Sequence, residues 1–142
     1  MRVVIDTNIA ISGLFWQGAP REVLELARSS SIRLYLSSDL LQELDEVLHR
    51  PKFAIRIART NQSIETILQN FAALCTVITA PPLPQPVASD ADDDAVLACA
   101  VAIDAAVIVS GDRHLLDLVT YAGIPIFAAH HFLQWAEVRL SS

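Results

Sequence analysis

Charged side chains are scarce in this sequence. They make up 18% of its 142 residues, whereas hydrophobic residues make up 53%. A composition this apolar argues against a chain that is disordered throughout. No uninterrupted apolar run approaches the ~20 residues that a membrane-spanning helix needs, so the hydrophobic residues are expected to form a core. At this length we expect one domain, over residues 1–142, and no membrane association.

Cysteine is also scarce, and the features of an export signal are missing. Cys75 and Cys99 both lie in apolar contexts without the spacing of a paired motif, so we expect two buried free thiols. The first residues, MRVVIDTN, reach an acid at Asp6 without the apolar core or the small-residue cleavage site of a signal peptide. Both observations predict a cytoplasmic protein.

Several signatures of nucleotide-handling α/β proteins do not occur. The sequence has neither G-x-x-x-x-G-K-[ST] nor G-x-G-x-x-G. The DTN segment lacks the second aspartate of the D-x-D motif of haloacid dehalogenases. A response-regulator receiver would need a lysine after a late strand, and the only lysine is Lys52. These absences disfavour all four classes.

Short β-branched runs alternate with longer helical segments, which predicts a parallel sheet with helices on both faces. The first strand should be followed by a loop that contains Gly13, Gly18 and Pro20, and Pro125 should place the last strand at an edge. We therefore expect an α/β fold of three layers, α/β/α, with a central parallel sheet of about five strands. The expected strands are residues 3–5, 34–36, 76–79, 107–109 and 124–127, and the expected helices cover roughly 20–29, 38–50, two pieces of 52–74, 92–103, 113–121 and 130 onward.

Two of the predicted strands end at an aspartate. Asp6 directly follows the first strand, and Asp112 follows the strand at 107–109 after Ser110 and Gly111. Sites in open parallel sheets form outside the carboxyl ends of the strands, so adjacent strands would bring both carboxylates into one crevice. Each aspartate could equally cap the helix that follows it, and both interpretations stay open.

Two more acids are less obvious. Asp90, Asp92 and Asp93 suffice to cap the alanine-rich helix, so Asp94 exceeds what capping needs, although it could simply complement the helix dipole. Close packing of the alanines on the sheet would hold Asp94 near the strand ends. Glu43 lies one turn into its helix, and its neighbours alone indicate a surface residue.

Four motifs resemble those of the PIN-domain nucleases in order and spacing, and the resemblance covers the whole chain. They are DTN at residues 6–8, the glutamate in SSDLLQEL, DDDAVLACA and VSGDRHLL. The segments DTNIAISGLFWQGAP and LDEVLHRPKF resemble most closely the bacterial PIN-family toxin components of toxin–antitoxin systems. The resemblance implies a PIN-like fold and maps the family's acids onto Asp6, Glu43, Asp94 and, as the usual fourth, Asp112.

The same resemblance implies roles. The four acids would be catalytic residues and metal ligands, while Asn8 and Ser110 fall where the family places polar groups that orient metal-bound water. Asp92 and Asp93 leave open which aspartate of the acidic run faces the site. We select Asp94 because it matches the family's D-x-x-L-A-x-A register.

Four carboxylates in one crevice repel each other. Two at ~4 Å cost about 4 kcal/mol at an effective dielectric of about 20, so the cluster needs protons or cations. An all-oxygen donor set favours Mg²⁺ or Mn²⁺ over zinc, and such an ion would polarise a phosphate and activate a bound water. Changing Asp6 or Asp94 to Asn should then abolish cleavage and leave metal-free stability equal or higher.

The resemblance implies hydrolysis of RNA phosphodiester bonds that leaves a 5′-phosphate. We therefore expect a metal-dependent ribonuclease, the toxin component of a toxin–antitoxin system. Its expected partners are an RNA substrate, a cognate antitoxin protein and a second copy in a homodimer. The alternative is a PIN-fold module that binds RNA or protein with little or no turnover.

The net charge of −6 is unusual for a nucleic-acid enzyme, but the basic residues are locally concentrated. They could guide the RNA backbone or form an ordinary solvated face. Trp16 could stack on an unpaired base, fill a hydrophobic gap or contact a partner, and His114 is expected at the surface. The basic stretch consists of Arg50, Lys52, Arg56 and Arg59.

Overall fold

The computed structural model describes residues 1–88 and 90–141, and these residues form a six-stranded sheet of order β3-β2-β1-β4-β6-β5. All neighbouring strands are parallel except β5 and β6, which form an antiparallel hairpin. Strand order reverses between β1 and β4. The strands are β1 (Arg2–Ile5), β2 (Arg33–Ser37), β3 (Thr76–Ile78), β4 (Val107–Val109), β5 (Thr120–Tyr121) and β6 (Ile124–Phe127).

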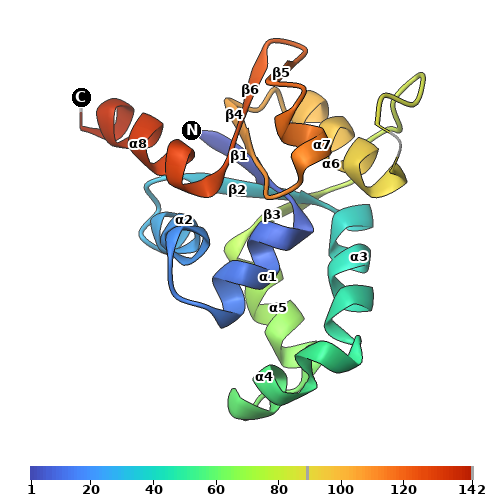
Figure 1. The fold of residues 1–142 in the computed structure, drawn as a ribbon, viewed down its shortest axis with the longest axis vertical. Helices are drawn as coiled ribbons and strands as arrows, with labels where there is room; N and C mark the ends of the chain where they lie inside the picture. The colour runs from blue at the N-terminus through green and yellow to red at the C-terminus, as the bar shows by residue number, and fades with distance from the viewer. Residues whose placement is uncertain (89, 142) are drawn as a thin grey trace.

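Helices cover both faces of the sheet (Figure 1). The face carrying α1, α3 and α5 is opposite to the face carrying α6 and α7, while α8 packs against α2. The predicted three-layer α/β/α fold is confirmed. The helices are α1 (Thr7–Phe15), α2 (Ala19–Arg28), α3 (Ser38–Leu48), the 3-10 turn η1 (Pro51–Phe53), α4 (Ala54–Arg59), α5 (Ile64–Leu74), α6 (Ala91–Ala102), α7 (Arg113–Leu116) and α8 (Ala129–Leu140).

The central strands are buried on both faces. Val3 and Val4 of β1 and Val107 of β4 are completely inaccessible to solvent. A continuous apolar run is typical of a parallel strand covered by helices on both sides, which is why the strands were readable from the sequence. Cys99 is buried, Cys75 is half-buried, and both are free thiols. No helix in the described part of the chain is long and apolar enough to cross a bilayer.

The loop expected after β1 is largely a helix, α1, with Gly13 inside it. A Cβ at Gly13 would lie 2.7 Å from Leu24 Cδ1 and 2.9 Å from the Pro20 carbonyl oxygen. Gly13 is therefore required by the close packing of α1 on α2 and does not mark a turn. The loop prediction was wrong because this contact is long-range.

The region after β4 also differs from its prediction. The expected helix over 113–121 stops at Leu116, and Thr120 and Tyr121 form the strand β5. As a result β6 is not an edge strand, because it lies between β4 and β5. Pro125 is tolerated there because the ladder with β4 begins one residue later, at Ile126, and no bond of that ladder needs a proline N–H.

Candidate active site

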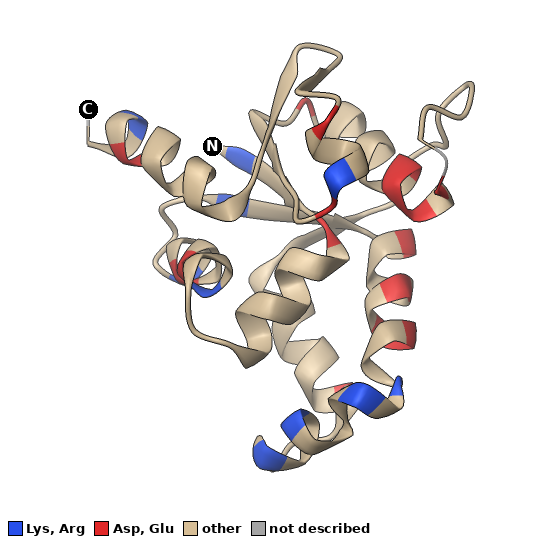
Figure 2. Ribbon diagram, in the orientation of Figure 1, with Lys and Arg blue, Asp and Glu red and all other residues tan. Residues whose placement is uncertain are grey.

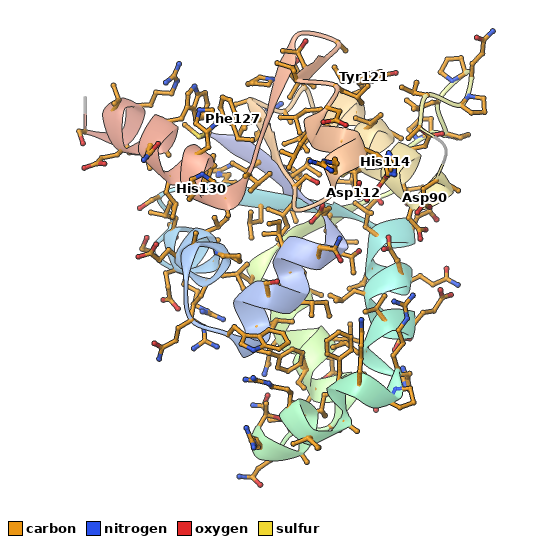
Figure 3. All side chains as sticks on the ribbon, viewed as in Figure 1. Asp90, Asp112, His114, Tyr121, Phe127 and His130 are labelled. Carbon is orange, nitrogen blue, oxygen red and sulfur yellow. The ribbon has the colours of Figure 1, made fainter. Side chains whose placement is uncertain are left out.

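A cleft of about 810 Å³ opens at the carboxyl ends of β1 and β4, where strand order reverses. Its walls come from α1, α3, η1 and the N-terminal turn of α6. Figure 3 shows Asp112 and Asp90 at this junction. The carboxylates that line the cleft are Asp6, Glu43, Asp90, Asp92, Asp93 and Asp112.

Asp6 is held rigidly at the end of β1. It is buried, and one carboxylate oxygen accepts a hydrogen bond from the Ile9 amide at 2.8 Å, which caps α1. The other oxygen accepts from the Ser110 hydroxyl and from the Gly111 amide at 3.0 Å. Burial raises the pKa of Asp6, and these three hydrogen bonds oppose that rise. Asp6 therefore caps a helix and lines the cleft at the same time.

Asp112, after the end of β4, also caps a helix and lines the cleft at the same time. Its Oδ1 accepts from the His114 amide at 2.7 Å and caps α7, while its own amide donates to Ser110 Oγ at 2.9 Å. The Ser110 hydroxyl thus links Asp112 to Asp6 from a completely buried position. Ser110 donates its single hydroxyl hydrogen to Asp6 and accepts from the Asp112 amide, so it has no further hydrogen to donate. Ser110 positions the acids, and its predicted role in orienting metal-bound water stays a prediction.

The structure places Asp93, not Asp94, in the cleft. The Asp94 carboxylate points to the proline-rich loop between β3 and α6, which contains PPLPQP at residues 81–86. There its Oδ1 accepts from the Ala88 amide at 2.7 Å and from the Val87 amide at 3.2 Å. Asp94 lines a separate hollow on that side. Asp93 is only 6% exposed, and its Oδ2 is buried without a hydrogen-bond partner. The placement predicted for Asp94 was therefore wrong.

Helix geometry explains this difference, because adjacent residues on a helix face directions about 100° apart. The residues three, four and seven positions after Asp93 are all buried against the sheet, namely Val96, Leu97 and Ala100. Seven positions after Asp94 comes Val101, which is 45% exposed. The burial pattern of α6 would have selected Asp93, whereas the motif register selected its neighbour.

Glu43 lies in the cleft and is not an ordinary surface residue. Leu40, three residues before it, and Val47, four residues after it, are buried, so Glu43 is on the inner side of α3. The sequence signal for this position was the spacing of Glu43 from Leu40 and Val47, whereas the charged neighbours of Glu43 had indicated a surface residue. The Thr7 hydroxyl, which sequence reasoning did not identify, forms a hydrogen bond with Glu43.

The electrostatics of the cleft favour protonated carboxyls near neutral pH. Burial, the charge of Asp112 and a hydrogen bond to Asp112 raise the pKa of Asp93 to about 7. Burial and the charge of Asp92 raise the pKa of Glu43 to about 7, against the effect of the Thr7 hydrogen bond. Without a cation, the cluster therefore binds protons that isolated carboxylates would release.

The remaining sequence candidates divide into residues inside and outside the cleft. Asn8 is exposed and lines it, beside Asp6. Asp90 lines it while capping α6 through the Asp92 amide at 2.9 Å. His114 is exposed, as expected. The far end of the cleft is lined by Trp16, Arg50, Lys52 and Phe53.

The donor set fits a divalent cation of the magnesium type. Within residues 1–88 and 90–141, no three His, Cys, Asp or Glu side chains already converge as a metal cage. Mg²⁺ does not require such a cage, because it is usually bound by one or two carboxylates and keeps several waters. The buried, unpartnered Oδ2 of Asp93 is an oxygen donor of the required kind in the required place.

Comparison with known proteins identifies the family. The sequence profile of the PIN domain matches residues 2–114, which include all six carboxylates of the cleft. PIN domains are generally nucleases, and they typically use divalent metal ions. A comparison with curated proteins finds no match. The chain belongs to the PIN-domain family.

Proposed function

We propose that this PIN domain is a metal-dependent ribonuclease that hydrolyses RNA phosphodiester bonds. The observation that carries this proposal is the buried, unpartnered Asp93 Oδ2 beside Asp112, in an open cleft at the ends of β1 and β4. A lone buried carboxylate oxygen is costly unless a ligand occupies it. A cation would satisfy that oxygen and offset the repulsion among the neighbouring acids.

The residues that would hold the ion are Asp6, Asp93 and Asp112, with Glu43 on the opposite wall. The ion, Mg²⁺ or Mn²⁺, would supply Lewis acidity toward the phosphate and lower the pKa of a bound water. Asp93 takes the place that the motif register gave to Asp94.

The chain's own groups prepare this chemistry. Hydrogen bonds from Ser110 and Gly111 fix the orientation of Asp6, so little reorganisation is needed when a ligand binds. The Glu43 carboxylate, on the α3 wall of the cleft, can accept the proton that an attacking water releases. Asn8, exposed at the same end of α1, can contact the substrate or a water.

The decisive experiment is cleavage mapping on total cellular RNA with Mg²⁺ or Mn²⁺. Asp93→Asn should abolish cleavage, and Asp94→Asn, the adjacent matched control, should retain it. Products should carry 5′-phosphates. Loss of cleavage in Asp94→Asn with activity retained in Asp93→Asn would contradict the assignment. RNA binding without turnover in the wild type would instead support the binding module.

We propose further that the enzyme is the toxin component of a toxin–antitoxin system and acts as a homodimer. The support is the similarity of residues 6–20 and 44–53 to the pattern of the bacterial PIN-family toxins. Induced expression should then arrest growth in the wild type and not in Asp93→Asn, and a small antitoxin from a neighbouring gene should restore growth. Unimpaired growth with active enzyme present would contradict the toxin role.

A further inference from the structure

The two ends of the cleft differ in chemistry. The carboxylates lie at the strand ends and along α3 and α6, whereas the basic residues of this region gather on η1 and α4 (Figure 2). The far end of the cleft combines the exposed ring of Trp16 with the ammonium group of Lys52. An aromatic ring beside a cation is a combination that binds single-stranded nucleic acid.

The Trp16 ring is partly exposed and is held in place by contacts with Arg56 and Phe15. The Arg56 guanidinium lies 4.4 Å from the centre of the Trp16 ring and donates a hydrogen bond to the Phe15 carbonyl at 3.2 Å. The Phe15 ring meets Trp16 edge-on at 6.2 Å. The ring is nevertheless 39% exposed and lines the cleft. A ring held in this way loses little conformational freedom when a base stacks on it.

The four residues of the basic stretch, Arg50, Lys52, Arg56 and Arg59, each have a different environment. Arg56 supports Trp16, and Arg50 lies close enough to Asp92 to oppose the rise of its pKa. Arg59 does not line the cleft. Lys52 lines the cleft, with its Nζ 5.1 Å from the centre of the Phe53 ring. Lys52 is therefore the cation best placed for a phosphate.

The first helix connects the two ends of the cleft. Asn8 and Ser12 lie one turn apart on α1, Trp16 is the extended residue that ends this helix, and all three line the cleft. Eight residues at 1.5 Å each place Trp16 about 12 Å from Asn8 along the helix. A stacked strand at ~3.4 Å per nucleotide covers that distance with about three to four nucleotides.

We propose that Trp16 and Lys52 form a nucleotide-binding subsite, in which an unpaired base stacks on the exposed face of Trp16 and Lys52 contacts a neighbouring phosphate. The base must be unpaired because a base inside a duplex has no free face for the ring. The inference rests on the proposed ribonuclease function only in assuming that RNA enters this cleft. The subsite itself needs no metal, since none of the six carboxylates belongs to it.

Fluorescence provides a direct test. In a Trp135→Phe background Trp16 is the only tryptophan, and penta-adenylate in chelator at low salt should quench its emission. In anisotropy titrations with the labelled oligonucleotide, Trp16→Ala should raise Kd about 5- to 100-fold, and Trp16→Phe should restore most of the affinity. Lys52→Gln should reduce the salt slope of log K by about 0.7, while Arg59→Gln leaves it unchanged.

The outcomes separate the subsite from the proposed reaction. With metal present, Trp16→Ala should raise KM for a short oligonucleotide and leave kcat near the wild-type value. Equal binding by wild type, Trp16→Phe and Trp16→Ala overturns the subsite even if the enzyme cleaves RNA, and leaves Trp16 as a protein-contact surface. Equal quenching by fully paired RNA also overturns it. Trp16-dependent binding without cleavage leaves the subsite intact and refutes the ribonuclease.

Discussion

The substitution Asp93→Asn should make the metal-free protein more stable at pH 8. Burial and the neighbouring Asp112 raise the pKa of Asp93 from 3.8 to about 7, so the ionised side chain destabilises the folded state. Each pKa unit corresponds to ~1.36 kcal/mol, which limits this effect to at most about 4 kcal/mol. Asparagine removes the charge and can donate a hydrogen bond to Asp112. We expect a gain of about 1–3 kcal/mol, or several degrees in Tm.

The gain should depend on pH in a defined direction. Between pH 4 and pH 7 the folded state keeps a proton on Asp93 that the unfolded chain releases, so wild-type stability falls as the pH rises through this range. Above pH 7 the destabilisation is complete, and at pH 4 it has nearly vanished. The difference between Asp93→Asn and wild type should therefore be near zero at pH 4 and largest at pH 8.

Magnesium should reverse the order of stabilities. A ligand at one hundred times its Kd stabilises the folded state by ~2.7 kcal/mol, and the wild type should receive this stabilisation while Asp93→Asn receives little of it. Urea unfolding at pH 4 and pH 8, with chelator or with Mg²⁺, measures all four conditions. The matched control is Asp94→Asn, which weakens the bonds to the Val87 and Ala88 amides and should be neutral or destabilising at both pH values.

One result would refute this reasoning. If metal-free Asp93→Asn is less stable than wild type at pH 8, and Mg²⁺ does not stabilise the wild type, then the Asp93 carboxylate is a structural group. The unpartnered Oδ2 would then be satisfied within the fold, and the site would lose its reason to bind a cation.

Three further changes test the positioning of the site. Asp6→Asn should lower the free energy of unfolding by about 1–3 kcal/mol, although charge repulsion alone predicts the opposite. Asparagine has a single acceptor oxygen, which cannot accept from Ile9 on one side and from Gly111 on the other. Unchanged urea midpoints would contradict this prediction. Ser110→Ala removes a hydrogen bond that lowers the pKa of Asp6, so this pKa should rise. The acid limb of the cleavage pH profile should then move to higher pH. An unmoved acid limb would argue against a role for ionised Asp6 in the reaction. Gly13→Ala should destabilise the fold by about 1–3 kcal/mol, because the added methyl group would collide with Leu24. The kcat of the folded enzyme should stay unchanged. Undiminished stability would mean that α1 and α2 separate easily.

The sheet and the acids at its strand ends were predictable from the sequence because the evidence for them is local. A buried parallel strand is a short apolar run; Asp6 directly follows one such run, and Asp112 follows another after Ser110 and Gly111. The helix α1 was not predictable in this way. Gly13 was interpreted as part of a loop, since only the contact with Leu24 shows why glycine is needed inside that helix.

The choice between Asp93 and Asp94 shows a different limit. A motif specifies positions along the sequence. The direction in which a helical side chain points depends instead on which face of the helix packs on the sheet. Leu97 is compatible with either aspartate, but Val101 is exposed and is in phase with Asp94. For the basic stretch the sequence left two interpretations open, RNA guidance or a solvated face. Arg56 contacts the Trp16 ring and the Phe15 carbonyl, and residue spacing does not reveal such a long-range contact.

Capping and metal binding were posed as alternatives for the acids at the strand ends, but the structure makes them compatible. Asp6 and Asp112 cap helices that begin at the cleft, and Asp90 caps α6 at the same place. The N-terminal ends of α1 and α6 carry partial positive charge, which offsets part of the repulsion among the carboxylates before any cation binds. Capping also fixes the acids in one orientation. It follows that Asp6→Asn should lose stability together with cleavage, whereas Asp93→Asn, whose Oδ2 caps no helix, should lose cleavage while metal-free stability rises.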